Sequence, residues 1–228
     1  MKLKDKLAFA LDISSSKEAI DMVNLLKGHV GYFKIGPQLF IRCGPDIVKR
    51  VQDRGAKVFL DLKLYDIPNT VSKSVESAIS LGVDFLSIHS LAGTNVLHAA
   101  KEAAGKELQL LAITVLTSAE KRIDGDMKNA LSNIYLSKIN GLVCSPLEAG
   151  WVKKQYNDMF VVTPGIRLLD DSLDDQNRVD TPHNAIANGS DMLVVGRTIR
   201  NSKDPVSTVE VILEQINGGL KAKDAALR

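Results

Sequence analysis

The sequence from residue 57 to residue 70 reads KVFLDLKLYDIPNT. Its first half is a short apolar run after Gly55, which is typical of a buried strand. Three charged residues, Asp61, Lys63 and Asp66, follow at the far end of that run. Residues two apart on a strand share a face, so Asp61 and Lys63 are predicted to point the same way. Because opposite charges at the end of a buried strand are costly unless paired, this pair taken alone is most simply a structural ion pair.

The same layout recurs along the chain. Eight short apolar runs alternate with eight segments of helical character, and glycine or proline separates nearly every pair. The apolar runs are continuous, which is typical of a parallel sheet buried on both faces. The predicted strands cover residues 6–13, 32–36, 58–64, 84–90, 108–116, 142–145, 159–163 and 191–195. The predicted helices cover residues 17–27, 45–54, 69–81, 95–104, 126–139, 146–156, 182–188 and 205–216.

Eight such units in 228 residues predict an α/β fold, a (β/α)8 TIM barrel that forms one domain over residues 1–228. We find no linker or shift in composition that would divide the chain. A doubly wound open sheet is the alternative, but no G-x-G-x-x-G motif follows the first predicted strand. The tail from about residue 218 is expected to be frayed.

The overall composition argues against several classes of function. Hydrophobic residues make up 45% of the chain and charged residues 25%, as in an ordinary globular protein. The net charge of +2 and the scattered aromatic residues argue against a nucleic-acid partner. Cys43 and Cys144 form no CxxC motif and no histidine cluster accompanies them, which indicates reduced thiols, no structural zinc and a cytoplasmic location. The apolar run after the basic residues 1–6 meets Asp12 too early for a signal peptide or a membrane span, so no membrane association is expected.

Charged and polar residues collect where the predicted strands end. In a barrel of this kind the active site lies at the C-terminal ends of the strands. Carboxylates and ammonium groups that converge in one pocket shift each other's pKa values and indicate a functional site. The predicted strand ends carry Asp12, Lys34, Asp61, Lys63, His89, Thr117, Ser118, Arg167 and Arg197.

The end of the last strand adds a candidate phosphate site. Barrels often bind phosphate at their final loops, where Gly196 would let the backbone approach an anion and Arg197 would offer a planar fork of donors. A strand that ends in Gly-Arg is, by itself, more often structural. Gln176 lies in the polar, acidic loop 168–179 and is placed to reach the same anion or to cover the pocket.

Several motifs taken together resemble those of the orotidine 5′-phosphate decarboxylase family. Residues 61–70, DLKLYDIPNT, resemble its D-x-K-x-x-D signature. The other landmarks are FALD at 9–12, FKIG at 33–36, TVLTS at 114–118, TPGIR at 163–167, DQ at 175–176 and GR at 196–197. The resemblance extends from about residue 6 to the final helix.

This resemblance implies that the protein converts orotidine 5′-monophosphate to uridine 5′-monophosphate and carbon dioxide, the last step of de novo pyrimidine synthesis. It implies no metal and no organic cofactor. Lys63 would protonate the carbon that carbon dioxide leaves, and Asp61 would lie against the departing carboxylate. Asp66, with Ile67 and Thr70, would reach the active site of a partner subunit, so the resemblance implies a homodimer with shared active sites.

The resemblance assigns the remaining site residues as well. Asp12 and Lys34 would hold the ribose hydroxyls and the charge network, and Thr117 would contact the pyrimidine ring. The implied catalytic residues are Lys63, Asp61, Asp66 and Lys34. The implied substrate-binding residues are Asp12, Lys34, Asp61, Ile67, Thr70, Thr117, Ser118, Pro164, Arg167, Gln176, Gly196 and Arg197, of which Gln176, Gly196 and Arg197 would hold the phosphate.

Three alternatives stay open on the sequence alone. The 3-keto-gulonate-phosphate decarboxylases share D-x-K-x-x-D but place a metal-binding carboxylate at the end of the second strand, where this chain has Lys34. A ribulose-phosphate epimerase would need paired metal-binding histidines at strand ends, and His89 is the histidine found there. A nucleotide-binding barrel without activity would have no use for the intact residues Asp61, Lys63 and Asp66.

Overall fold

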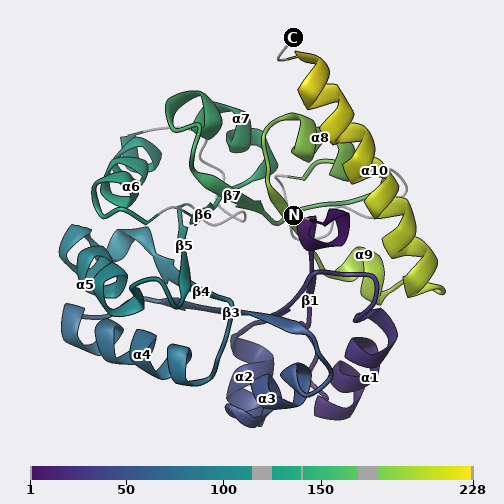
Figure 1. Ribbon diagram of the computed structural model, residues 1–228, viewed down its shortest axis with the longest axis horizontal. Coiled ribbons are helices and arrows are strands. Elements are labelled where there is room, and N and C mark those ends of the chain that lie inside the picture. Colours follow the sequence, from purple (N-terminus) through teal and green to yellow (C-terminus); the bar gives the residue numbers. More distant parts are fainter. Residues whose placement is uncertain (1, 115–124, 140, 169–178, 227–228) are drawn as a thin grey trace.

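The computed structural model describes residues 2–114, 125–139, 141–168 and 179–226 (Figure 1). The strands are parallel and form a closed barrel in which each pairs with its neighbours in chain order and β8 pairs with β1. This arrangement confirms the predicted (β/α)8 barrel. The strands are β1 Leu7–Ala10, β2 Tyr32–Ile35, β3 Lys57–Leu64, β4 Phe85–His89, β5 Gln109–Ile113, β6 Gly141–Val143, β7 Phe160–Thr163 and β8 Met192–Val195.

The α-helices surround the barrel as an outer ring (Figure 1). Proline occupies the first turn of α2, α4, α7 and α8, where its fixed φ suits a helix start and its missing N–H costs nothing. The helices are α1 Ser16–Leu26, α2 Pro37–Cys43, α3 Asp46–Gln52, α4 Pro68–Ser80, α5 Thr94–Ala104, α6 Gly125–Leu136, α7 Pro146–Gln155, α8 Pro182–Ala187, α9 Arg197–Arg200 and α10 Pro205–Ala226, with 3-10 turns η1 Leu3–Lys6 and η2 Ser90–Ala92. Two short helices, α2 and α9, are additions to the predicted elements.

The C-terminal segment differs from the expected frayed tail, because α10 continues as one helix to Ala226. The apolar spacing of Ile212 and Ile216, both fully buried, is continued by the partly buried Leu220. Gly219 lies against α8 so closely that an added Cβ would come within 2.5 Å of the His183 carbonyl oxygen. The glycines near residue 218 therefore let two helices approach each other and do not mark a helix end.

The core has two parts. The larger part fills the space between the outside of the barrel and the helices. The smaller part fills the N-terminal half of the barrel interior with Ala8, Tyr32, Phe59, Phe85, Leu111, Val162 and Met192, which we call the apolar floor. The ring of Phe85 packs edge-on against Tyr32 at 5.0 Å between centroids and stacks on Phe160 at 5.9 Å.

Side chains alternate along each strand, so the next inward positions lie one layer above the apolar floor. On the first four strands these positions hold polar or small residues: Ala10, Lys34, Asp61 and Ser87. The fold thus places charge at the C-terminal end of the barrel, above a closed apolar layer. Among the described helices, none is both long enough and apolar enough to cross a membrane.

Candidate active site

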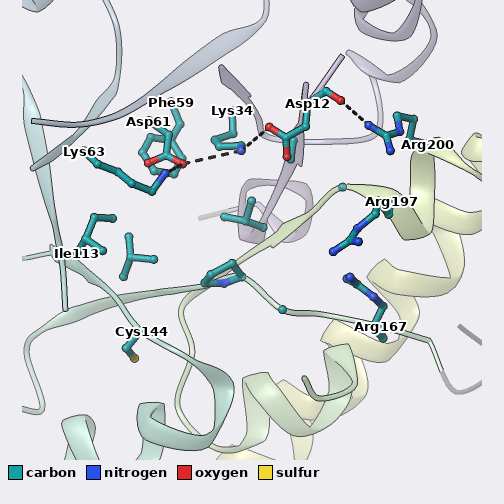
Figure 2. A pocket seen from close by; sticks show the side chains of 16 residues that line it. Asp12, Lys34, Phe59, Asp61, Lys63, Ile113, Cys144, Arg167, Arg197 and Arg200 are labelled. Carbon is teal, nitrogen blue, oxygen red and sulfur yellow. Dashed lines mark hydrogen bonds and ion pairs between the residues drawn. The ribbon is translucent and has the colours of Figure 1, made fainter. Parts of the chain in front are cut away.

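A cavity of about 220 Å³ opens at the C-terminal end of the barrel (Figure 2). Its base is Phe59 of the apolar floor, and its walls include inward side chains of β1, β2, β3, β5, β6 and β8. The charged residues that line it are Asp12, Lys34, Asp61, Lys63, Arg167, Arg197 and Arg200. The structure therefore brings most of the described charged residues predicted at strand ends into one cavity.

Four charges of alternating sign run along one wall of the cavity (Figure 2). The ammonium nitrogen of Lys63 lies 2.7 Å from Oδ2 of Asp61. The Lys34 nitrogen lies 2.8 Å from Oδ1 of Asp12 and 3.8 Å from Oδ2 of Asp61. The side chains of Lys34 and Asp61 are each only 11% exposed, so these interactions are screened less than surface ion pairs would be.

A glycine makes room for this network. A Cβ added at Gly36 would lie 3.3 Å from Oδ1 of Asp12 and 3.5 Å from the Lys34 nitrogen. A larger side chain would therefore press on both members of the Asp12–Lys34 pair. This contact gives the glycine of the FKIG stretch a steric reason.

The backbone of β3 is irregular where it carries the charges. Leu60 pairs with Leu86 and Leu64 with Ile88, so four steps along β3 match two along β4. Within this bulge Lys63 has a φ of 51°, a left-handed conformation that costs a non-glycine residue about 1–3 kcal/mol. The side chains of Asp61 and Lys63 meet as their spacing predicts, but a bulge rather than a regular strand presents them.

Asp66 is not part of this network within one chain. Its Oδ1 atom accepts a hydrogen bond of 2.7 Å from the backbone N–H of Ile67, and the residue is exposed. Ile67 is 65% exposed and Thr70 is also exposed. The structure thus separates these three residues from the cavity of their own subunit.

The opposite side of the cavity is rich in arginine. Figure 2 shows the guanidinium groups of Arg167 and Arg197 directed toward one another across this side, away from Lys63. Arg167 is buried, and its Nη1 atom donates a 2.9 Å hydrogen bond to the Ile166 carbonyl. Two positive groups that face one space favour an anion between them.

Backbone and neighbouring residues complete this arginine-rich side. Pro164 and Gly196, both predicted site residues, line it. A Cβ added at Gly196 would lie 3.3 Å from the Cβ of Ala10, which explains why a glycine follows β8. Arg200 also lines the cavity and donates to the backbone carbonyl of Asp12.

Some residues that line the cavity were not predicted from the sequence, and three predicted residues fall outside the described part of the chain. Arg200 lies three residues after Arg197 on the same short helix, a helical spacing that could have found it had α9 been predicted. Phe59, Ile113 and Cys144 also line the cavity. The predicted residues Thr117, Ser118 and Gln176 lie outside the described residues.

His89, at the end of β4, has a structural contact. Its Nδ1 atom accepts a 3.3 Å hydrogen bond from the backbone N–H of Leu91 and so caps η2. Burial lowers the pKa of His89 below its ordinary value, and the positive charge of Lys63 lowers that pKa further. Within the described ranges, we find no group of three or more His, Cys, Asp or Glu residues arranged to hold a metal ion.

Comparison with known proteins points in one direction. The family model described as "Orotidine 5'-phosphate decarboxylase / HUMPS family" matches residues 5–212. The orotidine 5'-phosphate decarboxylase of Syntrophotalea carbinolica is 40% identical over 240 aligned positions, which cover 97% of this chain and 98% of the relative. That of Desulfosudis oleivorans is 41% identical and covers 96% of this chain and 95% of the relative.

Solved structures agree with these sequence relatives. The crystal structure of orotidine 5'-phosphate decarboxylase from Lactobacillus acidophilus is 32% identical, has a TM-score of 0.79, and covers 93% of this chain and 99% of its own. An uncharacterized conserved protein from Geobacillus kaustophilus has a TM-score of 0.80 at 28% identity, covering 92% of this chain and 100% of its own. With a matched family model and full-length relatives near 40% identity, the chain belongs to the orotidine 5'-phosphate decarboxylase / HUMPS family.

Proposed function

We propose that this protein is an orotidine 5′-phosphate decarboxylase, which converts orotidine 5′-monophosphate to uridine 5′-monophosphate and carbon dioxide at the end of de novo pyrimidine synthesis. The observation that carries the proposal is the Lys63–Asp61 pair of 2.7 Å in a cavity whose other side holds two arginines. That layout suits a substrate with a carboxylate on a ring at one end and a phosphate at the other. The names of the full-length relatives support the same reaction.

In this reaction the bond between the ring carbon and the carboxylate breaks, and the electron pair stays on the carbon. The Lys63 ammonium stabilises that negative charge as it develops and then donates a proton to the carbon. The neutral amine regains its proton from solvent after carbon dioxide leaves. Because the positive charge is already in position, the site needs little reorganisation at the moment of reaction.

The neighbouring charges prepare Lys63 for this role. Asp61 contacts the Lys63 nitrogen and holds it on the cavity wall. Lys34, placed between Asp12 and Asp61, balances the two carboxylates and fixes their positions. Asp12 and Lys34 also present polar atoms that suit the hydroxyl groups of a ribose, because both line the cavity between Lys63 and the arginines.

The phosphate would bind between Arg197, Arg167 and the backbone at Gly196. Charged guanidinium groups make strong, geometrically defined hydrogen bonds to phosphate oxygens. The phosphate is remote from the reacting bond, so its binding energy can be used to position the substrate and raise the rate of the chemical step. Gln176, from the loop that follows β7, is proposed as a further phosphate ligand.

We propose that the reaction uses neither a metal nor an organic cofactor. The Lys63 ammonium supplies positive charge next to the reacting carbon. A metal ion in a metal-dependent enzyme would stabilise developing negative charge in the same way. Position 34, at the end of β2, carries an ammonium group in place of a carboxylate. This feature separates the site from the metal-dependent sister decarboxylases.

We further propose a homodimer in which Asp66, Ile67 and Thr70 complete the partner's site. Large apolar side chains that follow β3 and β4 are exposed: Tyr65 by 66%, Ile67 by 65% and Leu91 by 61%, and the Tyr65 ring lies 5.8 Å from that of His89. Exposed apolar side chains that cluster in this way mark protein interfaces. A cytoplasmic location is proposed as well, and the presence of Cys43 and Cys144 as reduced cysteines suits a reducing compartment.

The proposal is tested by mixing the purified protein with orotidine 5′-monophosphate and following ultraviolet absorbance in the presence of excess chelator. We expect steady conversion to uridine 5′-monophosphate at the same rate with and without the chelator. Activity that disappeared with the chelator would instead favour a metal-dependent sister reaction. Binding without conversion would favour a nucleotide-binding protein without activity.

A further inference from the structure

Ser87 lies in the middle of β4 on the inward face of the barrel, two residues after Phe85 of the apolar floor. It is fully buried, with 0% of its surface exposed. It is not among the described residues that line the cavity, so it lies behind the charged wall rather than on it. A buried hydroxyl in this place must use its hydrogen-bonding capacity within the protein.

Ser87 uses that capacity on the two charged residues of β3. Its hydroxyl donates a 2.8 Å hydrogen bond to Oδ1 of Asp61. The Oγ atom of Ser87 also accepts a 2.8 Å hydrogen bond from the backbone N–H of Lys63. An ionised carboxylate can only accept a hydrogen bond, and a backbone N–H can only donate one. The hydroxyl of Ser87 is therefore the donor in the first bond and the acceptor in the second.

The bond to Asp61 fixes the orientation of the carboxylate. Its Oδ2 atom faces Lys63 and Lys34, and its Oδ1 atom is held from behind by Ser87. Both oxygens are therefore engaged, from opposite sides. Rotation of the carboxylate away from the Lys63 ammonium would break the bond to the buried hydroxyl.

The bond to Lys63 supports the bulge. Between Leu60 and Leu64 the regular pairing of β3 with β4 is interrupted, and Lys63 has a left-handed backbone. The side-chain oxygen of Ser87 takes the Lys63 N–H at a point where the pairing of the two strands is shifted. A conformation of this kind persists only when its surroundings hold it in place.

We propose that Ser87 is a positioning residue for the decarboxylation, because it holds the side chain of Asp61 and the main chain of Lys63 with one hydroxyl group. This inference rests on the proposed function of Lys63 as the proton donor. Ser87 acts through Asp61 and Lys63 and does not touch the substrate. It therefore sets the position of the ammonium relative to the ring carbon, and small displacements there slow a reaction strongly.

The test compares Ser87→Ala with Ser137→Ala. Ser137 is also buried and donates one hydrogen bond, to the Asn133 carbonyl, at the end of the outer helix α6. We expect Ser87→Ala to lower kcat by about 10- to 100-fold, as supporting contacts of reactive groups typically do, and to change KM by less than about threefold. We expect Ser137→Ala to lower stability and leave kcat unchanged.

A second measurement follows the Lys63 backbone directly. Hydrogen exchange of the Lys63 amide in the free protein should accelerate at least about tenfold in Ser87→Ala, because its acceptor is gone. This result does not depend on the reaction, so it holds even if the unmodified protein fails to decarboxylate and the proposed function is lost. If Ser87→Ala does not fold, Ser87→Cys replaces it, since a thiol keeps the shape but bonds weakly.

Either of two kinetic results would overturn the inference. One is a kcat for Ser87→Ala within twofold of that of the unmodified protein. The other is a loss of activity that matches the loss of folded protein and occurs equally in Ser137→Ala, which would make Ser87 merely structural. An unchanged exchange rate at the Lys63 amide would remove its role in holding the bulge.

Discussion

The ammonium nitrogen of Lys63 lies 2.7 Å from Oδ2 of Asp61, and both residues project from an irregular part of β3 into the same cavity. Lys34, 3.8 Å from the same oxygen, extends the contact to Asp12. This arrangement places a fixed positive charge on the cavity wall, and each of the four charged groups has an opposite charge beside it. The first three predictions below test what that wall and its surroundings do.

Lys63→Ala should abolish turnover while leaving the barrel folded. Charge stabilisation is worth about 10²- to 10³-fold and proton donation about 10²- to 10⁴-fold, so we expect kcat to fall by at least about 10⁴-fold. Steady-state kinetics and circular dichroism measure the two properties. Lys17→Ala, on the exposed face of α1, is the matched control and should keep full activity. Near-normal turnover in Lys63→Ala would remove Lys63 from its proposed role.

Arg197→Ala should weaken the binding of phosphorylated ligands. A hydrogen bond to a charged group is worth about 1.5–3 kcal/mol, so Kd for uridine 5′-monophosphate should rise by about 10- to 150-fold. Uridine lacks the phosphate, and its Kd should stay constant. Calorimetric titration with both ligands gives the comparison, and Arg54→Ala, far from the cavity on the α3–β3 side, is the control. Equal effects on the two ligands would count against the phosphate assignment.

Mixing two inactive variants should restore activity if the sites are shared. In a hybrid of Lys63→Ala and Asp66→Asn chains, one site carries both lesions and the other carries neither. Random exchange in a two-fold dimer should therefore return about a quarter of the unmodified activity.

The control for this experiment mixes Lys63→Ala with Asp61→Asn. Asp61 and Lys63 contact each other within one chain, so every hybrid site keeps a lesion. That mixture should recover nothing. A lack of recovery in the first mixture, with subunit exchange demonstrated by mass spectrometry, would mean that each site is formed by one chain.

His89 should make stability depend on pH. Burial, and then the charge of Lys63, lower the pKa of His89 below its ordinary value of 6.5. Below pH 6.5 the unfolded chain therefore takes up the proton first, and the free energy of unfolding falls as the pH falls toward the lower, folded pKa.

Urea unfolding between about pH 7.5 and pH 5 measures this effect. His89→Asn should remove part of the decline, so the difference in stability between the unmodified protein and the variant should shrink as the pH falls. His98→Asn, on the exposed side of α5, controls for the change of side chain. Parallel profiles for the unmodified protein and His89→Asn would contradict the prediction.

Gly219→Ala should destabilise the barrel. The added methyl group would lie 2.5 Å from the His183 carbonyl oxygen, which belongs to the backbone and cannot rotate away. Overpacking of this kind costs about 1–3 kcal/mol. At Gly218 the nearest atom is 3.1 Å away, on the His183 side chain, which can move, so Gly218→Ala should cost less. Thermal unfolding measures both variants, and equal effects would show that the helix contact does not matter.

The barrel could be predicted because its strands are continuous apolar runs, and the pairing of Asp61 with Lys63 followed from their spacing. The bulge that presents this pair could not be predicted, since it depends on how β3 meets β4. The role of Ser87 could not be predicted for the same reason, because a lone serine in a strand gives no functional signal until its neighbours in space are known.

The end of the chain shows a different limit. The tail from about residue 218 is expected to be frayed because chain ends often are, and two adjacent glycines also weaken a helix. Contact with α8 outweighs that preference, because only residues without side chains allow the two helices to meet so closely. A single sequence does not reveal which surface a glycine faces.

The apolar floor fills the N-terminal half of the barrel interior, on the side away from the charged cavity wall. Tyr32, Phe59 and Phe85 pack together at the N-terminal end of the described interior, and the cavity opens at the C-terminal end. Under the proposed reaction, carbon dioxide forms beside Lys63, on the opposite side of the cavity from the arginines that would hold the phosphate. Carbon dioxide is then expected to leave through the same opening that admits the nucleotide.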